Sequence, residues 1–242
     1  MLIPQRRLAL QGSPNTRDLG GYPCAGGITR WGVFLRSATP GFLTGQDIET
    51  LRAYGVTTAV DLRSNEEKTR EPSQLLNRPG FTVYGVPLLD QMNSSYFEGD
   101  LPGSMSGLYI SLLENNSHDL VQIFEHLAGA AGACLFNCTA GKDRTGVVAM
   151  LLLHLAGVPN ADIEADYTVT EVYMREVFVQ RTGTLADQEI PDYIFRSLPE
   201  SMRRVLRHLE ENYGSAEAYL IKAGLAGETI ARLRKKLIET LP

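Results

Sequence analysis

A chain of 242 residues is long enough to bury the core of one α/β domain, and a second domain would have to be small. Hydrophobic residues make up 43% of the chain and charged residues 21%, which is ordinary for a globular protein and excludes disordered and fibrous classes. The net charge of -5 gives no long-range attraction for nucleic acid or anionic membranes, so any affinity for phosphate must be local.

The opening segment, Met1 to Leu10, is too short and too polar for a secretory signal. No stretch of the sequence reaches the roughly 18 apolar residues of a membrane span. We therefore expect a single cytoplasmic domain over residues 1–242, without nucleic-acid partners and without stable membrane insertion. Export by a route that needs no cleavable signal stays open.

The first half of the chain predicts helices and strands in alternation. Thr44 begins a helix, with Asp47 three residues on as a weak capping-box partner. Residues 56–62 predict a buried strand that finishes in charged residues, and in open α/β sheets ligands bind at that end of the strands. Residues 81–88 predict a further strand, and residues 89–107, rich in Gly, Ser, Asn and Pro, predict a long loop.

A helix near Ser117 and a short buried strand over residues 132–136 follow. The apolar residues of that helix recur at helical spacing (Leu120, Ile123, Phe124 and Leu127). The next apolar run, residues 147–153, predicts a buried helix. The segment between strand and second helix is therefore a loop at a helix N-terminus, where backbone N–H groups and the helix dipole attract an anion.

Helical patterns dominate the rest of the chain. We predict helices over roughly 160–181, 199–213, 215–223 and 227–240. Asn160, Ser215 and Gly227 stand where caps are expected. The expected fold is α/β: a central, mostly parallel sheet flanked by helices, with a helical C-terminal part over about residues 160–242.

Cys138 and Arg144 stand in the predicted loop with five residues between them. Cleaving a phosphate monoester requires an aligned nucleophile, charge stabilisation on the equatorial oxygens, and a proton for the leaving group. Cys138 would be the nucleophile, because converging amides and a helix N-terminus stabilise a thiolate. Arg144 would grip two oxygens in a planar fork, and Thr145 would offer its hydroxyl to the sulfur. Gly141 lets the backbone approach the phosphate without a Cβ in the way.

Other interpretations of the loop fit less well. A Walker-type nucleotide loop needs glycine in place of Phe136 and Ser or Thr in place of Asp143. A sulfurtransferase also uses a cysteine in an anion-binding loop, but Gly-Lys-Asp-Arg-Thr-Gly fits phosphate better. The three cysteines of the chain are too irregularly spaced for a disulfide framework or a zinc site, and no two histidines have a spacing that suits one metal ion. We expect no metal ion and no cofactor.

The segment from Cys138 to Gly146 resembles the Cys-x5-Arg-Thr/Ser signature of the protein tyrosine phosphatase superfamily. Its Ala-Gly-Lys-Asp-Arg-Thr-Gly sequence is similar to that of bacterial and fungal tyrosine/serine phosphatases that also act on phosphoinositides. Further segments match that family's pattern: Asn15 to Gly21, Phe34 to Ser37, Asp61 to Glu67 and, as C-terminal helices, Tyr213 to Leu233. The resemblance covers nearly the whole chain and implies a cysteine phosphatase fold. It also implies phosphotyrosine proteins as substrates, with phosphoserine/threonine and phosphoinositides as further candidates.

The residues expected to contact substrate belong to the loop and to two neighbouring segments. They are Asn137, Thr139, Ala140, Gly141, Lys142, Arg63 and Arg17. For Arg17 and Arg63 a buried ion pair is an equally good explanation. Lys142 would serve polyanionic head groups only if it faces the pocket.

Two aspartates compete for the role of general acid. Asp143 lies inside the loop, as in the related inositol-lipid phosphatases that take their acid from that segment. Asp61 lies at a neighbouring strand end, as the resemblance to the bacterial enzymes suggests. We place Asp143 slightly ahead for its location, and a salt bridge to a neighbouring arginine explains Asp61 equally well.

One position departs from the family pattern. The family has His immediately before the cysteine, where this chain has Asn137. Asn still donates and accepts hydrogen bonds, but it cannot carry charge. We expect a working enzyme whose thiol ionises less readily and whose rate is lower than that of its relatives. The alternative is a catalytically weak pseudophosphatase that binds phosphorylated partners.

Overall fold

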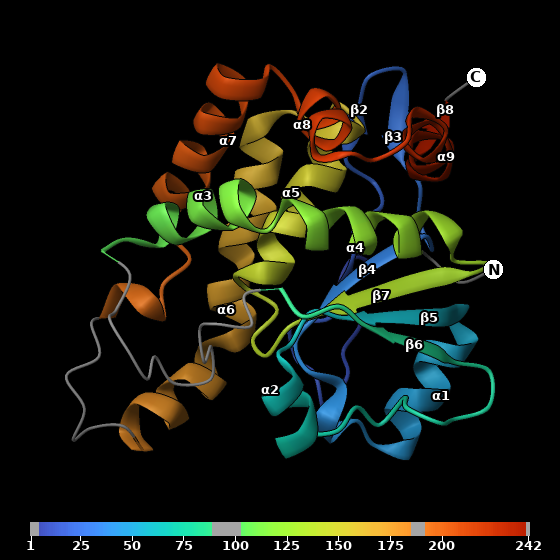
Figure 1. Ribbon diagram of the computed structural model, residues 1–242. Coiled ribbons are helices and arrows are strands. Elements are labelled where there is room, and N and C mark those ends of the chain that lie inside the picture. The colour runs from blue at the N-terminus through green and yellow to red at the C-terminus, as the bar shows by residue number, and fades with distance from the viewer. Residues whose placement is uncertain (1–4, 89–102, 185–191, 241–242) are drawn as a thin grey trace.

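A five-stranded sheet forms the centre of the protein in a computed structural model that describes residues 5–88, 103–184 and 192–240 (Figure 1). The strand order is β1-β4-β7-β5-β6. These strands are β1 (Arg17–Asp18), β4 (Phe34–Ser37), β5 (Val56–Asp61), β6 (Thr82–Gly85) and β7 (Ala133–Asn137). The last four run parallel and β1 is antiparallel to β4, so the sheet is mostly parallel, as the sequence predicts.

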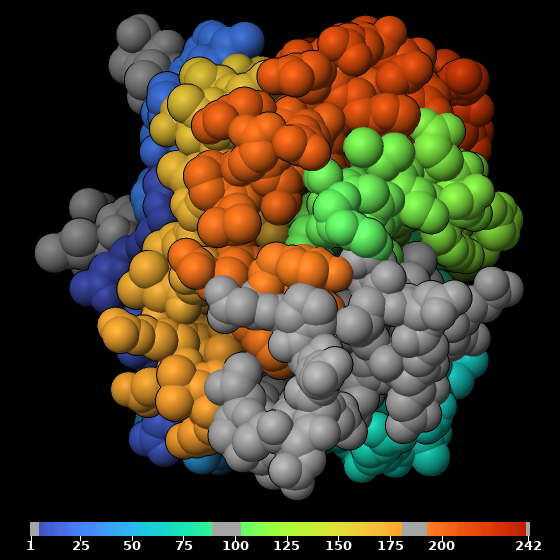
Figure 2. Space-filling view, turned by 90° about the vertical axis from the view of Figure 1, so that its left-hand side faces the viewer, coloured from blue at the N-terminus to red at the C-terminus, as the bar shows by residue number. Residues whose placement is uncertain are grey.

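Helices cover both faces of the sheet (Figure 1). On one side lie α1 (Gly45–Ala53) and α2 (Asn65–Arg70), and on the other side lie α3 (Met105–Asn115), α4 (Ser117–Gly129), α5 (Arg144–Leu155), α7 (Pro199–Tyr213), α8 (Ala216–Ala223) and α9 (Gly227–Leu237). The long helix α6 (Asn160–Thr184) packs on α5 and α7. Figure 2 shows α6, α7 and α3 side by side on one face of the molecule.

Three short strands and two short 3-10 helices complete the described elements. The strands β2 (Pro23–Cys24), β3 (Gly27–Thr29) and β8 (Ile238–Thr240) form a separate antiparallel sheet. The 3-10 helices cover Pro40–Phe42 and Asp192–Ile194. No helix in the described ranges combines the length and the apolar composition that crossing a bilayer requires.

The side chains of β7 alternate between two apolar cores. Cys134 and Phe136 belong to the larger core, which also contains buried residues of α4, α5 and α7 to α9. Ala133 and Leu135 belong to the smaller core on the α1 side. Successive strand residues point to opposite faces, so a strand covered on both faces must be apolar throughout. This explains the continuous apolar run in the sequence before Cys138.

Several predicted elements are confirmed with small shifts at their ends. Helix α1 begins after Thr44 with a complete capping box: the Thr44 hydroxyl accepts from the Asp47 N–H, and the Asp47 carboxylate accepts from the Thr44 N–H at 2.9 Å. The four apolar residues that recur at helical spacing in α4 are all buried. Ser215 caps α8 by accepting from the Ala218 N–H at 3.1 Å.

The predicted loop over residues 89–107 is wrong at its end. Residues 89–102 lie outside the described part of the chain, but residues 105–107 belong to α3, a helix that the sequence analysis did not predict. Ser104 caps this helix by accepting from the Gly107 N–H at 3.1 Å. Its Gly and Ser residues resemble those of a loop, whereas tertiary packing of buried residues such as Leu112 stabilises the helix.

The predictions for the C-terminal helices also need correction at their ends. The last helix stops at Leu237, because Ile238–Thr240 pair with β3 instead of continuing the helix. Its N-cap residue is Ala226 and not Gly227, and Asn160 lies inside α6. The early end of the last helix depends on pairing with a strand distant in sequence, which no local sequence pattern predicts.

The carboxyl ends of three parallel strands form one row at the edge of the sheet. Ser37 of β4 lies opposite Asn137 of β7, and Asn137 lies opposite Asp61 of β5. Residues 138–143, which we call the Cys138 loop, leave β7 at this row and lead directly into α5. The sheet thereby brings three segments far apart in sequence to one place.

Candidate active site

The Cys138 loop turns sharply at Gly141. This residue has φ +66°, a left-handed conformation that side chains other than glycine rarely adopt. A Cβ at this position would lie 2.4 Å from the carbonyl oxygen of Ser37. The loop can therefore lie close against β4 only with glycine at this position.

Side chains from outside the loop hold its carbonyl groups. Asn15 Nδ2 donates to the carbonyl oxygens of Ala140 and Gly141 at 2.9 and 3.1 Å. Arg36 Nη2 also donates to the Gly141 oxygen, at 2.8 Å. The C=O and N–H of one planar trans peptide point in opposite directions, so holding the carbonyls outward turns the following N–H groups inward. In the described part of the chain, the N–H groups of residues 139–143 have no acceptor.

A buried ion network stands behind these contacts. Asp166 of α6 accepts from Arg17 Nε at 2.9 Å and from Arg36 Nη1, and all three side chains are at most 1% exposed. Burial alone would raise the pKa of Asp166, but the two guanidinium groups hold that pKa well below its usual range. Arg17 Nη1 also donates to Asn15 Oδ1 at 2.6 Å, which turns the Asn15 amide nitrogen toward the loop.

Arg144 forms a two-point ion pair with Glu67 of α2. Arg144 Nη1 lies 2.7 Å from Glu67 Oε2, and Arg144 Nη2 lies 3.0 Å from Oε1. The same carboxylate accepts from the Thr139 hydroxyl and from the Ser64 N–H, the latter at 2.8 Å. Burial lowers the pKa of Arg144, but Glu67, together with Cys138 and Asp143, more than offsets this and raises that pKa above its usual value. The Arg144 guanidinium is thus held charged, in a fixed plane, beside the loop.

Asp61 belongs to a buried ion pair with Arg63. Arg63 donates to it through Nε at 2.9 Å and Nη2 at 2.7 Å. Asn137 Nδ2 donates to the same carboxylate at 3.2 Å. Arg63 Nη1 donates to Thr39 and to the carbonyl of Glu71, each at 2.9 Å. The Asp61 carboxylate therefore positions the side chains on either side of it.

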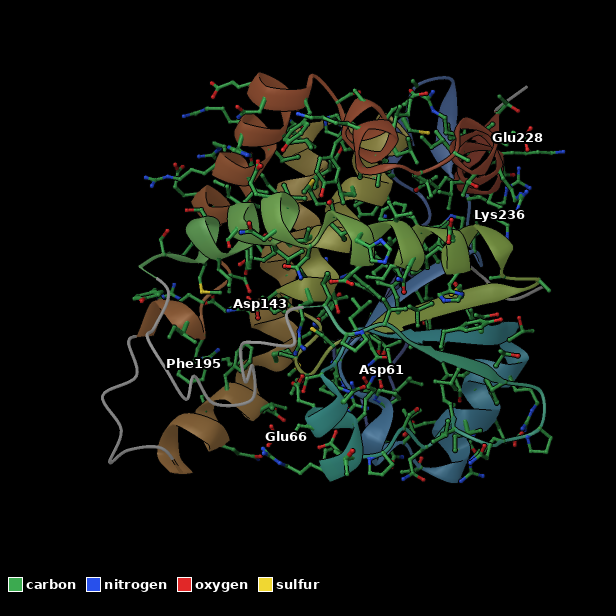
Figure 3. All side chains as sticks on the ribbon, viewed as in Figure 1. Asp61, Glu66, Asp143, Phe195, Glu228 and Lys236 are labelled. Atoms are coloured by element: carbon green, nitrogen blue, oxygen red, sulfur yellow. The ribbon has the colours of Figure 1, made fainter. Side chains whose placement is uncertain are left out.

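Asp143 has different surroundings. Its side chain is 28% exposed, compared with 3% for Asp61. The Tyr109 hydroxyl donates to Asp143 Oδ1 at 2.5 Å, and Lys142 Nζ lies 3.4 Å from the same oxygen. Figure 3 shows both aspartates at the end of the sheet where the loop lies, and Lys236 at the opposite end.

Three residues expected to contact substrate are buried and bound to protein groups. Arg17 and Arg63 are at most 1% exposed, and each of their side-chain nitrogens donates to a protein acceptor. Lys142 is 2% exposed, and its ammonium donates to the carbonyls of Ile194 and Arg196. The sequence left this structural explanation open for the two arginines, and the observed burial favours it.

Two buried polar atoms next to the loop lack partners. Asn137 Oδ1 and Thr145 Oγ1 have no hydrogen-bond partner in the described ranges. The expected hydrogen bond from the Thr145 hydroxyl to the Cys138 sulfur is therefore not formed in this structure. A buried hydroxyl without a hydrogen-bond partner is unusual in proteins.

The sequence analysis left several positioning residues out of its candidate site. They are Asn15, Arg36, Glu67, Tyr109 and Asp166. For Glu67 a signal exists, because Ser64-x-x-Glu67 is a capping-box pattern, and the box forms. Tyr109 and Asp166 lie on helices distant in sequence, and no spacing rule connects them to the loop.

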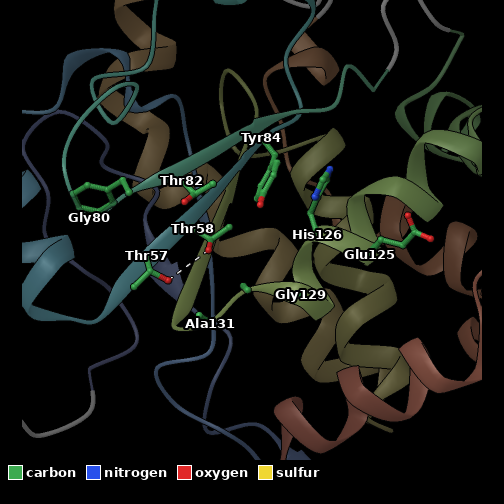
Figure 4. A pocket seen from close by; sticks show the side chains of 11 residues that line it. Thr57, Thr58, Gly80, Thr82, Tyr84, Glu125, His126, Gly129 and Ala131 are labelled. Atoms are coloured by element: carbon green, nitrogen blue, oxygen red, sulfur yellow. Dashed lines mark hydrogen bonds between the residues drawn. The ribbon is translucent and has the colours of Figure 1, made fainter.

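A hollow of about 430 Å³ lies between β6 and α4, away from the Cys138 loop (Figure 4). The rings of Tyr84 and His126 stack there with centroids 4.0 Å apart. It contains no residue of the Cys138 loop, so we do not assign the chemistry to it. The described residues include no group of three or more His, Cys, Asp or Glu side chains that could hold a metal ion.

Comparison with known proteins gives matches among family models, curated proteins and solved structures. The model of the tyrosine phosphatase family matches residues 8–239. The chain is 32% identical over 217 residues to a tyrosine-protein phosphatase of Nostoc commune, covering 85% of this chain and 74% of that protein. It is 26% identical over 275 residues to the triple specificity protein phosphatase PtpB of Mycobacterium tuberculosis, covering 95% and 98%. Among solved structures, P. aeruginosa TpbA in complex with pTyr matches with a TM-score of 0.42 and 14% identity over 80% of this chain and 87% of that one.

Proposed function

The chain belongs to the tyrosine phosphatase family. We propose that it hydrolyses phosphate monoesters through a phosphocysteine on Cys138, with protein phosphotyrosine as the main substrate. One observation carries this proposal. The carbonyls of the loop after Cys138 are held outward by Asn15 and Arg36, while the N–H groups of residues 139–143 have no acceptor among the described residues. Such an array binds the oxygens of a phosphoryl group, and the positive charge of Arg144 beside the loop adds electrostatic attraction for them.

The reaction proceeds in two displacements. The Cys138 thiolate attacks phosphorus, a P–S bond forms, and the P–O bond to the leaving group breaks while the general acid protonates the leaving oxygen. Water then attacks the phosphocysteine and gives its proton to the same carboxylate, and the P–S bond breaks to return the thiolate. The Thr145 hydroxyl, which has no partner in the described structure, is our candidate donor to the departing sulfur.

We assign the general acid to Asp143. Asp61 is nearly inaccessible and accepts from both Arg63 and Asn137, so protonating it would break contacts that position the site. Asp143 is part of the loop and partly exposed. Asp143→Asn should therefore slow phosphotyrosine hydrolysis much more than hydrolysis of p-nitrophenyl phosphate, whose leaving group needs no proton. Asp61→Asn should slow both substrates alike, and the reverse pattern would assign the acid to Asp61.

We assign residues 1–242 to one phosphatase domain that includes the helical C-terminal part. Support comes from the larger core, in which Phe136 of β7 and Val148 of α5 share one cluster with Leu206 of α7 and Leu233 of α9. Phosphoserine/threonine and phosphoinositides are further candidate substrates, and the name of the mycobacterial relative supports a broad specificity.

Rapid-quench detection of phosphate on the enzyme tests the proposal. With a phosphotyrosine peptide we expect label on Cys138 and release of inorganic phosphate, and neither with Cys138→Ser. Retention of the peptide without covalent label would instead indicate a pseudophosphatase. This outcome is worth testing because the chain has Asn137 where the family has His. A panel of phosphopeptides and phosphoinositides would then define the substrate class.

A further inference from the structure

The hydroxyl groups of two buried tyrosines form a hydrogen-bonded chain that ends on Asp143. Tyr109 of α3 donates to Asp143 Oδ1 at 2.5 Å. The hydroxyl oxygens of Tyr109 and Tyr167 of α6 are 2.7 Å apart. A tyrosine hydroxyl carries one proton, so when Tyr109 donates to the carboxylate, Tyr167 must be the donor to Tyr109. The chain therefore runs from Tyr167 through Tyr109 to Asp143.

Packing holds both rings in place. Tyr109 is 0% exposed and Tyr167 is 1% exposed, and both belong to the larger apolar core. Their rings meet edge to face, with centroids 5.9 Å apart and an interplanar angle of 80°. Neither hydroxyl can leave this hydrogen-bonded chain without a shift of its ring against the residues packed around it. The two tyrosines thus offer the carboxylate a donor in a fixed place.

Both tyrosines keep their protons at any working pH. Burial and the negative charge of Asp143 raise the pKa of each hydroxyl well above its usual value. Among the described residues, the charged groups that interact with Asp143 include Lys142, 3.4 Å away, and the guanidinium of Arg144. Arg36 and Glu171 act on the Tyr167 end of the chain. Changes in activity over the working pH range therefore do not come from titration of the tyrosines themselves.

We propose that Tyr109 and Tyr167 are positioning residues that hold Asp143 in one orientation and stabilise the negative charge left on it when it protonates the leaving group. This inference rests on the proposed role of Asp143 as general acid. As the P–O bond breaks, the proton passes from the Asp143 carboxyl to the ester oxygen. The carboxylate that remains accepts a stronger hydrogen bond from Tyr109, which Tyr167 polarises. No covalent bond to either tyrosine forms or breaks.

The pH profile of kcat distinguishes this role from a purely structural one. The general acid must be protonated to act, so activity should fall at high pH, where the acid has lost its proton. Tyr109 donates to the ionised form, and Tyr109→Phe should therefore move this falling limb to higher pH, by about 0.5–1 pH unit. The same variant should lower kcat on phosphotyrosine about tenfold and kcat on p-nitrophenyl phosphate much less. Tyr167→Phe should change both quantities in the same direction by a smaller amount.

Tyr219→Phe is the matched control. The Tyr219 hydroxyl is also buried and donates to the carbonyl of Leu113, on the same helix as Tyr109, at 2.7 Å. This variant loses a buried tyrosine hydroxyl without touching Asp143, and its pH profile should match the wild type. In the Asp143→Asn background, Tyr109→Phe should cause no further shift.

Two results would overturn the inference. One is a pH profile of kcat in which the falling limb of Tyr109→Phe coincides with that of Tyr219→Phe. The other is a shift of that limb by Tyr109→Phe that persists in the Asp143→Asn background. Failure of the proposed function looks different, because a wild-type protein that never forms phosphocysteine refutes the phosphatase assignment whatever the tyrosines do. If the wild type forms phosphocysteine on Cys138 but Tyr109→Phe leaves the falling limb of the pH profile unshifted, only the role of the tyrosines is refuted.

Discussion

Glu67→Gln should be among the most destabilising conservative substitutions near the loop. The Glu67 carboxylate accepts two hydrogen bonds from Arg144, one from the Thr139 hydroxyl and one from the Ser64 N–H. Glutamine has nearly the same shape, but it keeps one accepting oxygen and turns an NH₂ group toward the remaining donors. At least one hydrogen bond to the Arg144 guanidinium is lost. Arg144 then remains buried without the negative charge that Glu67 provides.

The magnitude follows from the burial of the pair. Arg144 is 2% exposed and Glu67 is 5% exposed, so solvent replaces little of what is lost. Breaking a buried ion pair by removing one partner costs about 3–5 kcal/mol of unfolding free energy. For a chain of this length that corresponds to a melting temperature about 6–20 °C lower. Because the guanidinium loses its fixed plane, kcat/KM on phosphotyrosine should also fall, by up to about 100-fold.

Glu66→Gln provides the control on the neighbouring residue. Glu66 (labelled in Figure 3) is 60% exposed and pairs with Arg70 one helical turn away, an exposed arrangement that contributes only about 0.3–0.5 kcal/mol. The change of charge is the same in both variants. Denaturant unfolding and thermal melting of the two, with steady-state kinetics, test the reasoning. The reasoning would be refuted if Glu67→Gln had wild-type kinetics and an unfolding free energy within about 1 kcal/mol of that of Glu66→Gln.

Gly141→Ala should lower both the melting temperature and kcat/KM, because a left-handed backbone costs a residue other than glycine about 1–2 kcal/mol and the new Cβ would meet the Ser37 oxygen. Gly45→Ala, with open space at its Cβ, should lower neither. Equal melting temperatures of the two variants would contradict this prediction. Asn137→His should move inactivation by iodoacetate to lower pH, and identical pH profiles would count against a role for this position in thiol ionisation. Asp166, whose pKa is held down by two arginines, should stabilise the fold at neutral pH and lose this contribution as the pH falls below about 4. Acid unfolding compared between wild type and Asp166→Asn measures this, and parallel pH dependences would exclude it.

Local patterns in the sequence were sufficient for the parts of the site that are contiguous. An apolar strand, a loop with Cys138 and Arg144, and an apolar helix follow one another within about twenty residues, and each carries its own periodicity. Glycine at position 141 predicts a backbone that only glycine adopts easily, and φ there is +66°. Capping boxes at Thr44 and Ser64 also form between residues three apart. These features depend on neighbours in the chain, which a single sequence displays.

Only the tertiary structure decided how the loop is supported and which carboxylate is accessible. Asn15 lies 125 residues from the carbonyl it holds, and Tyr109 lies 34 residues from Asp143, so no spacing rule connects them. The sequence shows Asp61 and Asp143 as the same residue type. Their accessibility differs because Arg63 folds back onto Asp61, while Asp143 stays partly exposed. Burial and pairing depend on contacts between distant segments, and these exist only once the sheet has aligned the ends of its strands.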